Sequence, residues 1–192
     1  MLHQAVKGRL SNMHIVKMTT LDQTQIGQAA GILTACLPVG WPSLPDALAE
    51  IRERLIPENT MLAALEDDIV IGWGGILAPI YGGRVFELHP LAVRCDRQNR
   101  GIGRCLVSAL EDEARRRGGL TIYLGSDDES EDGETSLAKV DLFADLPDKL
   151  RHFRPGTHPT GFYLALGYKI IGVMPDANGR GKPDIFLAKR LS

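Results

Sequence analysis

The chain has 192 residues, of which 44% are hydrophobic and 24% are charged, and its formal net charge is −2. This length and apolar content predict one domain spanning residues 1–192 with a full core. The near-neutral charge excludes the global basic field that attracts nucleic acid. No apolar run reaches membrane-spanning length, and the first residues lack the apolar core of a signal peptide. Together with three cysteines that show no redox or metal spacing, these features predict a cytoplasmic protein without nucleic-acid or membrane partners.

Apolar periodicity, caps and turn residues predict an alternating α/β chain. The expected order is a strand (13–18), two helices (22–35 and 44–56), three strands (60–66, 69–77 and 85–93), a helix (101–117), a strand (120–124), a short helix (160–166) and two strands (168–174 and 183–189). Asp22 is the expected N-cap of the first helix. Gly72, Gly74 and Gly75 loosen one strand and suggest a close backbone approach there.

Residues 126–158 form a long insertion that is polar and, at its start, acidic. A segment of this length inside a compact domain is either functional or disordered. We expect it to cover the acceptor side of a site or to form the contact of a homodimer.

The most informative segment is 84–119, which predicts a strand, a turn and an amphipathic helix. Apolar side chains recur in the helix at the 3.6-residue period; they are Ile102, Leu106, Val107, Leu110 and Ala114. The turn before the helix reads Gln98-Asn99-Arg100-Gly101-Ile102-Gly103. A glycine-containing turn that opens a helix points several backbone N–H groups in one direction, which suits a pyrophosphate. Arg100 and Arg104 add positive charge at the same place.

The turn lacks the Gly-Lys-Ser/Thr ending of a P-loop, and Cys105 and Leu106 stand where a Rossmann fingerprint needs its third glycine. It resembles instead the coenzyme motif of the GNAT family of N-acetyltransferases, in which Gln/Arg-x-x-Gly-x-Gly/Ala follows a strand ending in Leu-x-Val. Here the strand ends in Leu91-Ala92-Val93. The segment Phe162-Tyr163 to Gly167-Tyr168 resembles the second signature of the family, although His158-Pro159-Thr160 replaces its usual Asn-x-x-Ala.

The resemblance covers nearly the whole chain. It implies the α/β acyl-CoA N-acyltransferase fold, with a mixed, mostly antiparallel central sheet, a splayed central strand pair and flanking helices. It also implies acetyl-CoA as cosubstrate, without a metal. Pro90 cannot donate to a regular ladder and marks a bulge or a splayed strand end.

The resemblance assigns coenzyme contacts to two groups of residues. Leu91 and Val93 would bind the pantetheine arm, and the backbone N–H of Val93 would stabilise the oxyanion. The turn and first helical residues would hold the pyrophosphate; they are Gln98, Asn99, Arg100, Gly101, Ile102, Gly103 and Arg104.

Acyl transfer to an amine needs a general base, because an alkylamine with a pKa near 10.4 is almost fully protonated at pH 7. Glu87 and His89 lie two residues apart, so on a regular strand both point to one face, and either could take the proton. Each could equally be a structural residue, with Glu87 in an ion pair and His89 as a polar core residue. By resemblance, Tyr163 is the general acid that protonates the coenzyme thiolate; without the motif it would be interpreted as a core tyrosine.

Acceptor recognition is expected from Trp41 and from the acidic residues Asp127, Asp128 and Glu129, which suit a polycationic amine. Further segments, among them Glu87 to Leu91 and Val173 to Gly179, resemble the subgroup of aminoglycoside 6′-N-acetyltransferases. Two alternatives stay open: an acetyltransferase for another small-molecule or protein amine, and a coenzyme-binding sensor or interaction module without turnover.

Overall fold

The computed structural model describes residues 12–191, which fold as two compact units. The first unit contains the described residues up to Leu120 together with Leu191, and the second spans Thr121–Arg190. The elements of the first unit are β1 (Met13–Lys17), η1 (Met18–Thr20), α2 (Gln23–Cys36), α3 (Leu44–Arg54), β2 (Thr60–Glu66), β3 (Ile69–Ile76), β4 (Val85–Val93), η2 (Cys95–Arg97) and α4 (Ile102–Arg116). Those of the second are β5 (Thr121–Asp127), α5 (Leu146–Arg151), α6 (Thr160–Ala165), β6 (Lys169–Met174) and β7 (Asp184–Arg190).

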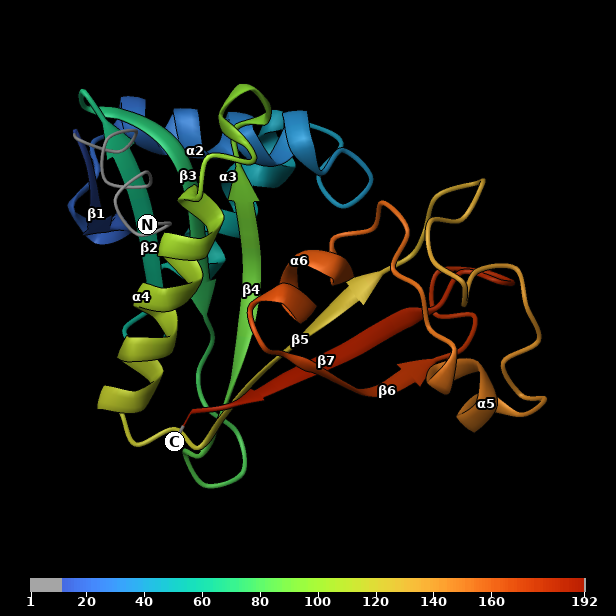
Figure 1. The fold of residues 1–192 in the computed structure, drawn as a ribbon. Helices are drawn as coiled ribbons and strands as arrows, with labels where there is room; N and C mark the ends of the chain where they lie inside the picture. The colour runs from blue at the N-terminus through green and yellow to red at the C-terminus, as the bar shows by residue number, and fades with distance from the viewer. Residues whose placement is uncertain (1–11, 192) are drawn as a thin grey trace, which may run out of the picture. The chain divides into compact units, whose positions relative to one another are not determined.

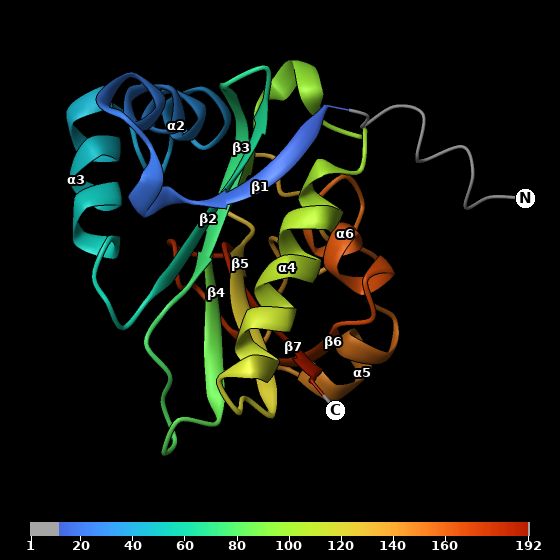
Figure 2. The same cartoon turned by 90° about the vertical axis from the view of Figure 1, so that its left-hand side faces the viewer.

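In the first unit, β1, β2, β3 and β4 form an antiparallel sheet in that order. Helices α2 and α3 cover one face of this sheet and α4 covers the other (Figures 1 and 2). The fully buried Trp73 of β3 lies in the core on the α2 side, where its indole N–H donates to the Ala29 carbonyl at 2.9 Å. The apolar stripe of α4 is buried as its periodicity predicts.

Local signals account for the ends of these elements. Asp22 and Gln25 form a capping box at the start of α2, and Ser43 accepts from the Asp46 amide at the start of α3. Asp67 and Asp68 adopt positive φ angles in the two-residue turn between β2 and β3, as a tight hairpin of this handedness requires.

The glycines of β3 allow its backbone to lie close to β4. A Cβ atom at Gly72 would lie 3.0 Å from the Ala92 carbonyl oxygen, and one at Gly74 would lie 2.9 Å from that of Pro90. The register shifts beyond Gly74, which pairs with Leu91, because Ile76 pairs with Leu88. Two residues of β4, one of them Pro90, therefore stand opposite one of β3, so the predicted bulge is confirmed.

In the second unit, β7 pairs antiparallel with both β5 and β6. Strand β5 continues three residues beyond the predicted end at residue 124, because its polar end stays paired with β7 as far as Asp127 and Asp184. Backbone hydrogen bonds hold the segment after β5: the Ser136 amide donates to the Arg154 carbonyl within the segment at 3.0 Å, and the Lys139 amide donates to the Gly181 carbonyl, between β6 and β7, at 2.8 Å. It also contains α5, which periodicity did not predict, since this helix has only six residues.

The described part of the chain contains no helix that is long and apolar enough to cross a membrane. The single domain over residues 1–192 that the composition predicts stays a prediction.

Candidate functional site

The loop between β4 and α4 has the geometry of an anion site. Asn99 and Gly101 adopt positive φ angles of 58° and 92°, which turn the chain into the helix. No side-chain hydrogen bond caps the helix at Gly101, and the first intrahelical bond runs from the Cys105 amide to the Gly101 carbonyl. The amides of the first turn, from Ile102 to Arg104, are therefore left without intrahelical acceptors, and the positive end of the helix dipole lies there. These residues fit the pyrophosphate of a coenzyme.

The positive charges near this loop fall into two classes. Arg94 is paired with Asp96 at 2.6 Å and Arg97 with Glu66 at 2.9 Å, so both guanidinium groups are engaged in the protein. No carboxylate within residues 12–191 is paired with Arg100 or Arg104. Arg100 and Arg104 are therefore available to bind a phosphate, whereas Arg94 and Arg97 are already paired.

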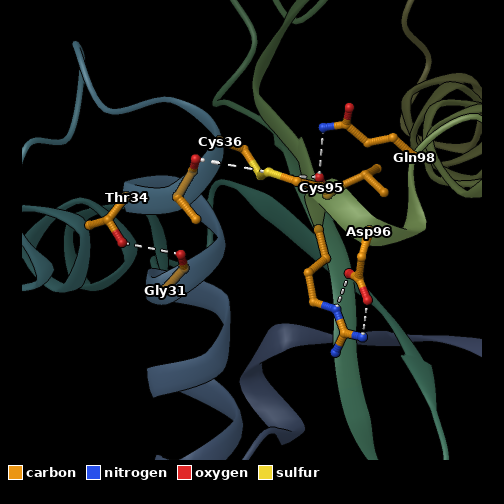
Figure 3. The surroundings of a disulfide bond; sticks show 9 residues. Gly31, Thr34, Cys36, Cys95, Asp96 and Gln98 are labelled. Carbon is orange, nitrogen blue, oxygen red and sulfur yellow. Dashed lines mark hydrogen bonds and ion pairs between the residues drawn. A yellow bond between two sulfur atoms is a disulfide. The ribbon is translucent and has the colours of Figure 1, made fainter.

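Two contacts anchor the approach to the loop (Figure 3). The Gln98 side-chain amide donates to the Val93 carbonyl at 3.1 Å, so this motif residue ties the loop to the end of β4. Cys36 at the end of α2 and Cys95 in η2 form a disulfide with a Cα–Cα distance of 6.3 Å. The cysteine count did not indicate this pairing, whereas Cys105 is a free thiol on α4.

The register of β4 decides where its backbone groups point. The Arg94 amide donates to the Ile71 carbonyl, which makes this residue pair a hydrogen-bonded one. Hydrogen-bonded and non-hydrogen-bonded pairs alternate in an antiparallel ladder. Val93 pairs with Gly72 and Leu91 with Gly74, and by this alternation both are non-hydrogen-bonded pairs. Their N–H groups consequently point away from β3, the orientation that contact with a pantetheine arm requires.

The side chains of β4 alternate in burial along the whole strand. Glu87, His89, Leu91 and Val93 lie on its half-buried face, as predicted for the first two from their spacing. The ring of Trp41 lies 6.0 Å from that of His89, measured between centroids, so the structure brings these two predicted site residues together.

Tyr163 lies on the buried side of α6 and is 8% exposed. Its ring makes edge contacts with Phe162 and Tyr168. Burial raises the pKa of the Tyr163 phenol above its usual value of 10.0. The phenol therefore keeps its proton at neutral pH.

His158 is a residue whose role sequence reasoning missed. It is 5% exposed, and its Nε2 lies 2.9 Å from the Asp127 carbonyl oxygen, to which it can only donate. Nδ1 is then the unprotonated nitrogen, and it accepts from the Thr160 hydroxyl at 2.6 Å and from the Thr160 amide at 3.3 Å. His158 thus ties the start of α6 to the end of β5, in the place where the family motif has another residue. The sequence signal that could have indicated this role is the replacement of the usual Asn-x-x-Ala of the motif by His158-Pro159-Thr160.

The three acidic residues after β5 differ in their surroundings. Asp128 is 1% exposed, and its carboxylate accepts from the amides of Glu134 and Thr135 at 2.9 and 2.7 Å. Asp127 is exposed and accepts from the Asn178 side chain. Partial burial, together with the nearby Asp127 charge, raises the pKa of the Glu129 carboxyl. Asp128 therefore shapes the segment, whereas Asp127 and Glu129 present negative charge.

Within residues 12–191, no three His, Cys, Asp or Glu side chains are grouped so as to hold a metal ion.

Comparison with known proteins agrees with this geometry. The model of the acetyltransferase (GNAT) family matches residues 28–139. The chain belongs to this family. The predicted acetyltransferase family and α/β fold are thereby confirmed, although the splay of the central strands stays a prediction.

Among solved structures, an aminoglycoside 6′-N-acetyltransferase complexed with coenzyme A is 37% identical, with a TM-score of 0.86, over 93% of this chain and 97% of that one. The aminoglycoside 6′-N-acetyltransferase from Enterococcus faecium is also 37% identical over the same shares, with a TM-score of 0.84. An aminoglycoside 6′-acetyltransferase type Ii is 34% identical, again over 93% and 97%, with a TM-score of 0.72. No curated protein matched the chain in a sequence search.

Proposed function

We propose that this protein transfers an acetyl group from acetyl-CoA to the 6′-amine of an aminoglycoside. The coenzyme part rests chiefly on the uncapped start of α4 behind the Gln98–Gly103 turn. The assignment of the acceptor rests on solved structures of aminoglycoside 6′-acetyltransferases, which are 34–37% identical to this chain over 93% of its length.

The coenzyme is held along β4 and the following loop. The amides of the first turn of α4, with Arg100 and Arg104, bind the pyrophosphate. The N–H groups of Leu91 and Val93 bind the pantetheine arm, and that of Val93 donates to the oxyanion that forms during transfer. Gln98 holds the peptide at Val93 in place by its bond to the Val93 carbonyl.

Transfer is direct. The neutral acceptor amine attacks the thioester carbonyl carbon, and the carbon–sulfur bond breaks as the amide forms. The departing thiolate takes its proton from Tyr163, and the amine proton passes to His89 or Glu87, directly or through water.

The acceptor carries several ammonium groups, for which Asp127 and Glu129 supply partners. Partial burial and the nearby Asp127 charge raise the pKa of the Glu129 carboxyl, and a cation bound beside Glu129 would favour its ionised form. Trp41 offers an aromatic face beside His89.

The test is thiol release from acetyl-CoA with kanamycin, tobramycin, spermidine, lysine and a short peptide as acceptors. Release with the aminoglycosides alone, with the acetyl group located on the 6′-nitrogen by mass spectrometry, is the expected result. Release only with another amine would keep the chemistry and overturn the acceptor. Coenzyme binding by calorimetry without release on any amine would favour a binding module instead.

A further inference from the structure

Glu50 of α3 provides His89 with a partner that no motif indicates. Its Oε1 lies 3.3 Å from His89 Nε2 and 2.7 Å from Arg54 Nε. The Glu50 side chain is only 12% exposed, whereas that of His89 is 34% exposed. A nearly buried carboxylate therefore faces one nitrogen of a half-exposed imidazole.

The surroundings restrict the imidazole on a second side. Trp41 lies against the ring at an interplanar angle of 51°. His89 is, with Pro90, one of the two bulge residues of β4, and Glu50 belongs to a helix whose Ala47 and Ile51 are fully buried. Both partners are thus carried by rigid elements, and their 3.3 Å separation is only slightly longer than an ordinary N–H···O hydrogen bond. Catalytic hydrogen bonds are commonly long before substrate binds.

We propose that Glu50 is a positioning residue that makes His89, rather than Glu87, the general base of the reaction. Its carboxylate accepts the Nε2–H of His89, so the lone pair on Nδ1 takes the proton from the acceptor amine. The imidazolium that forms is then paired with Glu50, whose Oε1 also accepts from Arg54 Nε. This inference rests on the proposed acetyl transfer and concerns which group accepts the proton.

The test compares Glu50→Gln with Glu53→Gln, which removes the same charge from an exposed position of the same helix. We expect Glu50→Gln to lower kcat about tenfold to a hundredfold with the KM for the aminoglycoside nearly unchanged, and Glu53→Gln to change neither. In a background carrying His89→Gln, adding Glu50→Gln should cause little further loss, since the two residues act as a unit. A raised KM with unchanged kcat, or losses that multiply in the double variant, would overturn the proposal.

A second measurement does not depend on turnover. In protein with ¹⁵N-labelled histidine, His89, assigned through His89→Gln, should show protonated Nε2 and unprotonated Nδ1, and Glu50→Gln should abolish this preference. If no amine is acetylated but this signature is present, the proposed function fails while the Glu50–His89 pairing stands. A His89 without a Glu50-dependent tautomer overturns the pairing itself.

Discussion

At the scale of single residues, burial gives Tyr163 a property that its proposed role as general acid requires. Desolvation raises the pKa of its phenol, so the proton that Tyr163 is proposed to give to the thiolate is retained through neutral and moderately alkaline pH. Phenylalanine keeps the ring contacts and removes only the donor. We therefore expect Tyr163→Phe to lower kcat about a hundredfold or more, measured as thiol release.

The neighbouring Tyr168 provides the control for this variant. It is fully buried and packs edge-on against Tyr163, so Tyr168→Phe tests whether loss of any phenol from this cluster has the same effect. Equal activity of wild type and Tyr163→Phe would remove Tyr163 as the acid.

Asp128 is a second residue whose surroundings define its role. Because its buried carboxylate holds two backbone amides, Asp128→Ala should reduce the free energy of unfolding by about 2 kcal/mol or more. Urea denaturation measures this loss, and limited proteolysis should show earlier cleavage after β5. Asp132→Ala, at a fully exposed position, should have almost no effect. An unchanged stability of Asp128→Ala combined with a raised acceptor KM would instead assign Asp128 to the acceptor.

At the scale of elements, the start of α4 depends on the left-handed conformation of Gly101. A Cβ atom there would meet no neighbour within 4 Å, so the cost of alanine is conformational, about 1–2 kcal/mol. Gly101→Ala should destabilise the protein and raise the KM for acetyl-CoA, since the first-turn amides are displaced. Gly27→Ala, in the interior of α2 and equally open, should stabilise it by about 0.5–1 kcal/mol. An unaltered KM in Gly101→Ala would show that the loop tolerates another path into the helix.

The disulfide between α2 and η2 closes a long loop, because its two cysteines are separated by 59 positions in the sequence. In the chain-entropy model, a loop of this length corresponds to about 4 kcal/mol of stability. We expect one reactive thiol in the denatured, unreduced protein and three after reduction, and a lower melting temperature for the reduced form. Three thiols without reduction would contradict the disulfide.

At the scale of the whole molecule, binding of acetyl-CoA should stabilise the folded chain by mass action. At a coenzyme concentration of about 100 times Kd the expected gain is roughly 2.7 kcal/mol, seen as a rise of several degrees in melting temperature. Acetyl-pantetheine, which lacks the pyrophosphate, should stabilise much less at the same concentration. Equal stabilisation by both ligands would mean that the start of α4 does not bind the phosphates.

The sequence by itself determined the elements and the family. Several features that define the elements depend only on residues close together in the sequence, so the sequence alone predicts them. They are the Asp22–Gln25 capping box, the Asp67-Asp68 turn and the glycine-containing turn before α4. Strand β4 was predicted with its observed bounds, since its alternation and its Pro90 bulge are local features as well.

Only the tertiary structure decided which side chains meet. Three contacts each join residues more than thirty positions apart in the sequence: Glu50 with His89, Cys36 with Cys95, and His158 with Asp127. Asp127 and Asp128 are adjacent and of one type, yet one is exposed and the other buried on two amides. The physical reason is that strand register, helix packing and burial fix these distances, and none of them is a property of neighbours in the sequence.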